Sequence, residues 1–175
     1  MRVFIAIDMP EQVKKKIKGI QEQLPEFKGK KTEEYNLHLT LKCLGEVDEE
    51  RIEELKEKLN QIKMKKFKIK IDKIGVFSEN VIRIIWLGVD ESCKELWSLQ
   101  KEIDLKLKDL YPEEKRFMGH ITIARVKKVD KNEFLSKLKE MKIDIETEVG
   151  SFKLKKSVLT AEKPVYEDIL SINLE

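Results

Sequence analysis

Both histidines of this chain open the same four-residue pattern, in which an apolar residue, a threonine and a second apolar residue follow. The first copy spans residues 38–41 and the second spans residues 120–123. Residues i and i+2 of a β-strand project from the same face, so each copy would present one imidazole and one hydroxyl together above an apolar core. The repetition of this pattern at both histidines indicates shared chemistry rather than coincidence.

Two imidazoles and two hydroxyls that face one cleft suit a phosphodiester. An ordinary histidine pKa near 6.5 lets a neutral ring take a proton from the attacking oxygen while a protonated ring gives one to the leaving oxygen. The hydroxyls of Thr40 and Thr122 would donate to the non-bridging oxygens, where negative charge grows in the transition state. This reaction needs no metal or other cofactor. We therefore take His38 and His120 as the candidate catalytic residues.

Other interpretations stay open at this point. A lone strand histidine is usually a structural residue, although the repeat argues against that. A two-histidine zinc site lacks a third ligand at suitable spacing in either motif. Ribonuclease-like cleavage would use the same acid and base with the RNA's own 2′-hydroxyl as nucleophile. A non-catalytic binder of RNA or nucleotide 2′-phosphates would keep the cleft and show no turnover.

The elements around the motifs repeat along the chain. Strands are expected at about residues 35–43 and 116–127, and the two histidines lie 82 residues apart, close to half the chain length. Apolar residues at helical or strand spacing predict the remaining elements. These are helices after Pro10 and within 48–62, 93–110 and 131–141, a hairpin of 67–77 with 81–89, and strands at 148–154, 157–162 and 168–174, with a Gly- and Lys-rich loop at 28–34.

This order predicts an α+β fold. We expect a single bilobal domain, residues 1–175, in which two lobes related by a pseudo-two-fold axis pack antiparallel sheet beneath outer helices. Each lobe would carry one motif, and the two motifs would face each other across a central cleft.

Composition sets the broad class. A 41% hydrophobic share suits a folded core, and a net charge of +3 among 36 basic and 33 acidic residues neither demands nor excludes a nucleic-acid partner. Cys43 and Cys93 fit neither a disulfide framework nor a metal spacing, so we expect both to be reduced and buried. No apolar run has the length of a signal-peptide core or a membrane span, which predicts a cytoplasmic, non-membrane protein.

The motifs and their flanks resemble the 2H phosphoesterase superfamily and, within it, the LigT-type RNA 2′,3′-cyclic phosphodiesterases, historically called 2′-5′ RNA ligases. The resemblance runs nearly end to end. It is carried by residues 2–10 (RVFIAIDMP), 36–46 (NLHLTLKCLGE), 76–77, 86–89 (WLGV), 120–126 (HITIARV) and 164–167 (PVYE). One departure is Met118-Gly119 before the second histidine, where relatives commonly carry Arg-Pro.

The resemblance implies hydrolysis of 2′,3′-cyclic phosphate ends of RNA, or of cyclic nucleotides, to a 2′-phosphate, by a monomer without a cofactor. His38 would protonate the leaving 3′-oxygen and His120 would activate the water. Thr40 and Thr122 would hold the phosphate, and Arg125 would assist substrate binding. Strict alternation places Arg125 on the opposite face from His120, so a β-bulge or the strand end would have to redirect it. Ligation of 2′-5′ ends is the same reaction in reverse.

Some further residues have two interpretations. Lys42 shares the parity of His38 and Thr40, so it could reach a phosphate, although a surface position is favoured. Four aromatic residues could stack a base, but core packing is favoured for each. These are Phe4, Tyr35, Phe77 and Trp86. The lysines within 63–66 and 153–156 could follow an RNA backbone, although solvated surface is the simpler interpretation.

Overall fold

Nine strands join into one antiparallel sheet in the computed structural model, which describes residues 1–175. The strand order is β7-β4-β5-β6-β3-β1-β8-β9, and β2 pairs with β6 beside this path. The elements are β1 Arg2–Asp8, α1 Glu11–Glu22, β2 Lys28–Lys31, the 3-10 helix η1 Glu34–Asn36, β3 His38–Glu46, α2 Glu49–Asn60, β4 Phe67–Val76, β5 Ile84–Val89, α3 Lys94–Lys106, β6 His120–Lys128, α4 Lys131–Glu140, β7 Ile145–Val149, β8 Ser151–Leu159 and β9 Pro164–Asn173.

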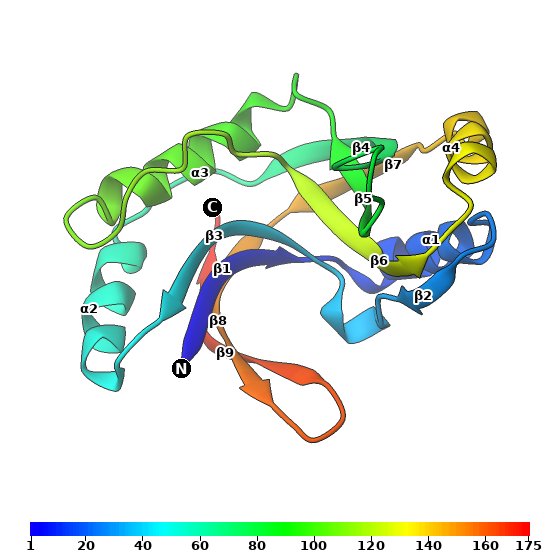
Figure 1. Cartoon of the computed structure of the whole chain (residues 1–175). Helices are drawn as coiled ribbons and strands as arrows, with labels where there is room; N and C mark the ends of the chain where they lie inside the picture. Colours follow the sequence, from blue (N-terminus) through cyan, green and yellow to red (C-terminus); the bar gives the residue numbers. More distant parts are fainter.

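The helices cover the outside of the sheet: α2 packs beside α3, and α1 and α4 lie toward the other end of the molecule (Figure 1). Each helix turns an apolar stripe inward, as in α2, where Ile52, Leu55 and Leu59 are buried. Together with the sheet these stripes form a core of 39 buried hydrophobic residues. No helix is both long enough and apolar enough to cross a lipid bilayer. The predicted α+β class is confirmed.

The two motif strands meet at the centre of the sheet. β3 and β6 pair antiparallel, with Leu39 of the first motif opposite Ile121 of the second. Their burial patterns, iBiBBeBie and iBiBBeBee (B buried, i intermediate, e exposed), agree at all but one of nine positions. β1 flanks β3 as β5 flanks β6, also antiparallel. The axis of the predicted two-fold relation between the lobes therefore passes between the two motif strands.

Each motif strand carries a β-bulge at the fourth residue of its motif. Beside β1, the register passes from Thr40 to Lys42 and leaves Leu41 unpaired. Beside β5, it passes from Thr122 to Ala124 in the same way. A bulge shifts the alternation of side chains by one residue. Arg125 consequently returns to the face of the histidines, as its predicted role requires.

The same shift makes the parity interpretation of Lys42 wrong. After the bulge, Lys42 points to the opposite face, where its side chain is buried and forms an ion pair with Asp104. Its Nζ also donates to the carbonyl oxygen of Pro112 at 2.7 Å. Asp104 Oδ2 in turn accepts from Gln100 Nε2 at 3.1 Å and from the backbone N–H of Glu114 at 3.0 Å. Lys42 thus joins β3 to α3 and to the segment before β6.

Three other expectations need correction. The predicted loop at 28–34 contains strand β2, because β6 offers a free edge on which it pairs. Cys43 is exposed, since the bulge turns it outward, although its thiol is free as predicted. Tyr35 and Phe77 do not pack in the core: 44% and 54% of their surfaces stay exposed.

Candidate active site

A cavity of about 470 Å³ opens on the face of the sheet that carries both motifs. All five residues that the sequence singled out line it: His38, Thr40, His120, Thr122 and Arg125. The volume is typical of a site for one small ligand. Elements that are distant in the sequence complete the wall, namely β1, β2 and its following loop, and the β8–β9 hairpin.

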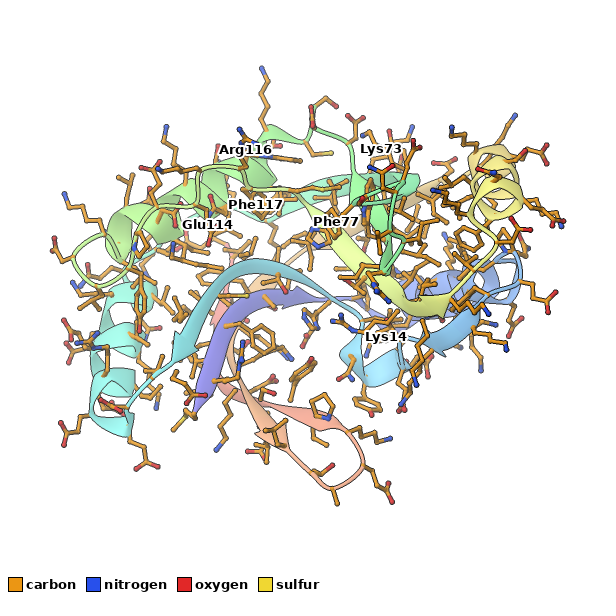
Figure 2. All side chains as sticks on the ribbon, viewed as in Figure 1. Lys14, Lys73, Phe77, Glu114, Arg116 and Phe117 are labelled. Atoms are coloured by element: carbon orange, nitrogen blue, oxygen red, sulfur yellow. The ribbon has the colours of Figure 1, made fainter.

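The ring of His120 is oriented by its own backbone. Its Nδ1 lies 2.9 Å from the carbonyl oxygen of Met118. A carbonyl only accepts hydrogen bonds, so Nδ1 carries the proton and Nε2 is left for a substrate. Phe77 packs edge-on against the ring, with centroids 5.2 Å apart at 89°; Figure 2 shows Phe77 beside the start of β6.

Close packing against α3 explains the glycine at position 119. A Cβ at this position would lie 2.8 Å from Leu96 Cδ2 on α3 and 3.3 Å from Val89 Cβ. A larger residue would require the Leu96 side chain to shift, so glycine lets the start of β6 pack against α3 without that movement. The departure from the Arg-Pro of relatives therefore fits the close packing behind His120.

His38 lies in an aromatic corner. The Phe4 ring stands 5.1 Å away at 33°, and the Tyr166 ring stands 5.4 Å away at 84°. Burial by these rings, together with the positive charge of Lys155, lowers the pKa of His38 from its ordinary 6.5 to about 4. The charge of Asp8 and a hydrogen bond to the Asn36 backbone act in the opposite direction. In the free protein, His38 is therefore neutral at pH 7.

A closed network of four charges lies behind His38. Asp8, the cross-strand partner of His38, accepts from Lys153 at 3.0 Å and from Lys155 at 2.8 Å. Asp168 binds the same two ammonium groups, each at 2.9 Å. Burial alone raises the pKa of Asp8, but its hydrogen bonds to the two lysines outweigh that effect and keep the pKa below its usual value. These lysines are thus neutralised and do not form the RNA-tracking cluster that the sequence allowed.

The sequence and the fold of this chain match those of known proteins. The family model described as LigT like Phosphoesterase matches twice, at residues 7–86 and 87–166. The chain belongs to this family. Curated relatives named RNA 2′,3′-cyclic phosphodiesterase include those of Methanocaldococcus jannaschii, 44% identical over 97% of this chain and 98% of the relative, and of Archaeoglobus fulgidus, 36% identical with the same coverage. The Escherichia coli LigT structure in its apo form superposes with a TM-score of 0.83 over 99% of this chain and 96% of the other, at 23% identity. The predicted resemblance is confirmed.

The donor atoms of this LigT-like phosphoesterase do not resemble a metal centre. No group of three or more His, Cys, Asp and Glu side chains gathers anywhere in the chain in a way that could hold an ion. The two motif histidines come without a third ligand, whereas zinc sites in proteins use at least three. The side chains that share the cavity with the histidines include three threonines and five cations, which suit an anionic ligand.

The cavity wall carries a clear excess of positive charge. Its cations are Arg2, Lys30, Lys31, Arg125 and Lys163, and its one carboxylate is Glu33. Glu33 is engaged by Lys163 at 2.9 Å, and hydrogen bonds from Lys163 and Tyr35 lower its pKa to about 2. A positively charged concave surface attracts phosphate.

Sequence reasoning missed several residues of this site. Asp8, Lys155 and Asp168 come from three strands, and no spacing along the chain connects them. Tyr166 lies inside the PVYE stretch that carried the resemblance. That match was the signal that could have identified Tyr166 as a residue of the site. Cys43 lines the cavity at the position related by the two-fold to Arg125.

Proposed function

We propose that this phosphoesterase hydrolyses 2′,3′-cyclic phosphate ends of RNA to 2′-phosphates by metal-independent acid–base catalysis from His38 and His120. The observation that carries the proposal is the meeting of both motifs in one cationic cavity at equivalent positions of two lobes. The names of the curated relatives support the substrate class. A solved structure of Escherichia coli LigT complexed with 3′-AMP shares the fold, with a TM-score of 0.82.

In the proposed reaction, water attacks phosphorus while Nε2 of His120 takes its proton. The bond from phosphorus to the 3′-oxygen breaks, and His38 gives a proton to that oxygen, which leaves the phosphate on the 2′-oxygen. The hydroxyls of Thr40 and Thr122 donate to the non-bridging oxygens. Hydrogen bonds to charged groups contribute about 1.5–3 kcal/mol each, so both threonines favour the transition state. Arg125 offsets the phosphate charge.

For His38 to act as the acid, substrate binding must raise the pKa of the His38 ring. The free ring has a pKa of about 4, whereas an acid at pH 7 must hold its proton. A bound phosphate anion favours the imidazolium and raises this pKa.

We expect an NMR titration to place the His38 pKa near 4 in the free protein and clearly higher once a nucleoside 2′-phosphate, the product, is bound. The His120→Gln spectrum assigns the ring signals. Lys155→Met, which removes a cation that lowers this pKa, should raise it in the free protein. If the His38 pKa stays near 4 in the complex, the assignment of the two histidines must be exchanged, with His38 as the base and His120 as the acid.

The activity itself has a direct test. Purified protein should convert an oligoribonucleotide with a 2′,3′-cyclic phosphate end into a product whose phosphate is on the 2′-oxygen, with equal rates in the presence and absence of EDTA. The position of the phosphate in the product is determined by NMR or by its resistance to a 3′-specific phosphatase. Measurable binding without turnover would select the non-catalytic binder. Activity lost in EDTA and restored by zinc would contradict metal independence.

A further inference from the structure

One rim of the cavity concentrates positive charge, and the proposed chemistry uses only Arg125 of it. The rim is made by β2 and the C-terminal half of β6, which pair antiparallel and lie side by side in Figure 1. Its cations are Lys28, Lys30, Lys31, Arg125, Lys127 and Lys128. Lys30 has an ion pair, with Glu33 at 3.4 Å, and no carboxylate lies within ion-pair distance of the others.

Stability does not explain this rim. Lys28 lies opposite Lys128 and Lys30 lies opposite Arg125 in the strand register. Like charges directly across an antiparallel pair destabilise it. Gly29 permits the close approach of the two strands, because a Cβ there would be 2.1 Å from the carbonyl oxygen of Arg125. The chain carries a net charge of only +3, so the cluster is a local arrangement that an anion would stabilise.

The rim lies where a polynucleotide would leave the site. Lys30, Lys31 and Arg125 line the same cavity as the two histidines. A volume of about 470 Å³ suits roughly one nucleotide, so any upstream strand must cross an edge of the cavity. At the β8–β9 hairpin, Lys163 is already engaged by Glu33. At the β1 edge, Arg2 lies opposite Glu46 in the register.

The outer end of the rim is less favourable for an anion. Lys28 and Lys128 line a neighbouring hollow that also holds Glu26, Asp130 and Glu133. The inner end of the rim, at Lys30 and Lys31, lines the cavity and lies away from these carboxylates. Lys31 has no ion-pair partner, and Lys30 shares the single carboxylate of Glu33 with Lys163.

We propose that Lys30 and Lys31 form a second phosphate subsite, which binds the internucleotide phosphate upstream of the 2′,3′-cyclic end. The subsite makes the enzyme select RNA strands over cyclic mononucleotides. This inference rests on the proposed function and adds the residues that bind the RNA strand beyond the cyclic end. Phosphate contacts of this kind depend on charge and are weakened by salt.

The test compares kcat/KM for a 2′,3′-cyclic mononucleotide and for a short oligoribonucleotide with the same cyclic end. The wild type should prefer the oligoribonucleotide. In Lys30→Gln/Lys31→Gln, the ratio of kcat/KM for the oligoribonucleotide to kcat/KM for the mononucleotide should fall roughly 10-fold or more. The salt slope of log kcat/KM for the oligoribonucleotide should become shallower by roughly 0.7 for each lost phosphate contact.

Two matched variants serve as comparisons. Lys101→Gln removes one exposed charge from α3, outside the cavity, and should match the wild type on both substrates. Arg2→Gln removes a cavity cation at the opposite edge and should leave the ratio of the two kcat/KM values unchanged. The double variant should unfold at the same or a higher urea concentration than the wild type, because like-charge repulsion is relieved.

The outcomes separate the two proposals. If the wild type hydrolyses neither substrate, the proposed function fails. If it hydrolyses both equally well, or if the double variant loses both activities to the same extent, the subsite is refuted while the function stands. A selective loss of oligoribonucleotide activity in Arg2→Gln instead would place the strand at the other edge and also overturn the subsite.

Discussion

Replacing His38 or His120 with alanine is expected to lower kcat for a 2′,3′-cyclic phosphate by roughly 100- to 10,000-fold. Each substitution removes one of the two proton transfers that the proposed reaction requires. Because both transfers belong to one step, the double variant should be little worse than the poorer single variant. Steady-state kinetics on a cyclic mononucleotide measures the effect without any contribution from an upstream strand.

The control for this result is the fold. His38 contacts Phe4 and Tyr166, so its loss could disturb the aromatic corner. His38→Gln and His120→Gln retain a polar side chain of similar size, and should unfold near the wild-type midpoint while showing the same loss of kcat. Wild-type kcat in either glutamine variant would remove that histidine from the mechanism.

Asp104→Ala should lower the free energy of unfolding by about 3–5 kcal/mol, because it leaves the buried ammonium of Lys42 without its counter-charge. Both side chains are nearly inaccessible, with 1% of Lys42 and 4% of Asp104 exposed. The substitution also removes the acceptor of the Glu114 N–H, in the segment that leads to β6. Urea unfolding followed by circular dichroism measures the change.

The matched control replaces both partners. Lys42→Met/Asp104→Leu keeps the volume apolar and should recover much of the lost stability, since no buried charge is then left unpaired. A loss of less than about 1 kcal/mol in Asp104→Ala would show instead that water reaches the Lys42 ammonium and solvates it.

Local patterns determined much of this protein. The period-two alternation around each histidine predicted that His and Thr share a face, and the structure places all four side chains on one cavity. Apolar stripes predicted the helices, because burial of one helical face needs only the spacing of residues along the chain. The repeated motif with its flanks was enough to place the chain in its family.

Tertiary pairing decided the rest. The bulges at Leu41 and Ile123 arise from the registers with β1 and β5, and they exchange the inward and outward sides for the residues that directly follow. This is why Lys42 is buried while Arg125 reaches the cavity. β2 has too little apolar character to predict a strand, and it forms because the edge of β6 supplies hydrogen-bond partners.

The electrostatics of the site were equally beyond local reasoning. Equivalent strands carry the two histidines, yet Asp8 stands opposite His38 and Gly88 stands opposite His120. The network of Asp8 with Lys153, Lys155 and Asp168 exists only because β1, β8 and β9 are neighbours in the sheet. A side chain's type and spacing follow from the sequence, but its pKa depends on the burial and charges that distant segments bring to it, and these appear only when the chain has folded.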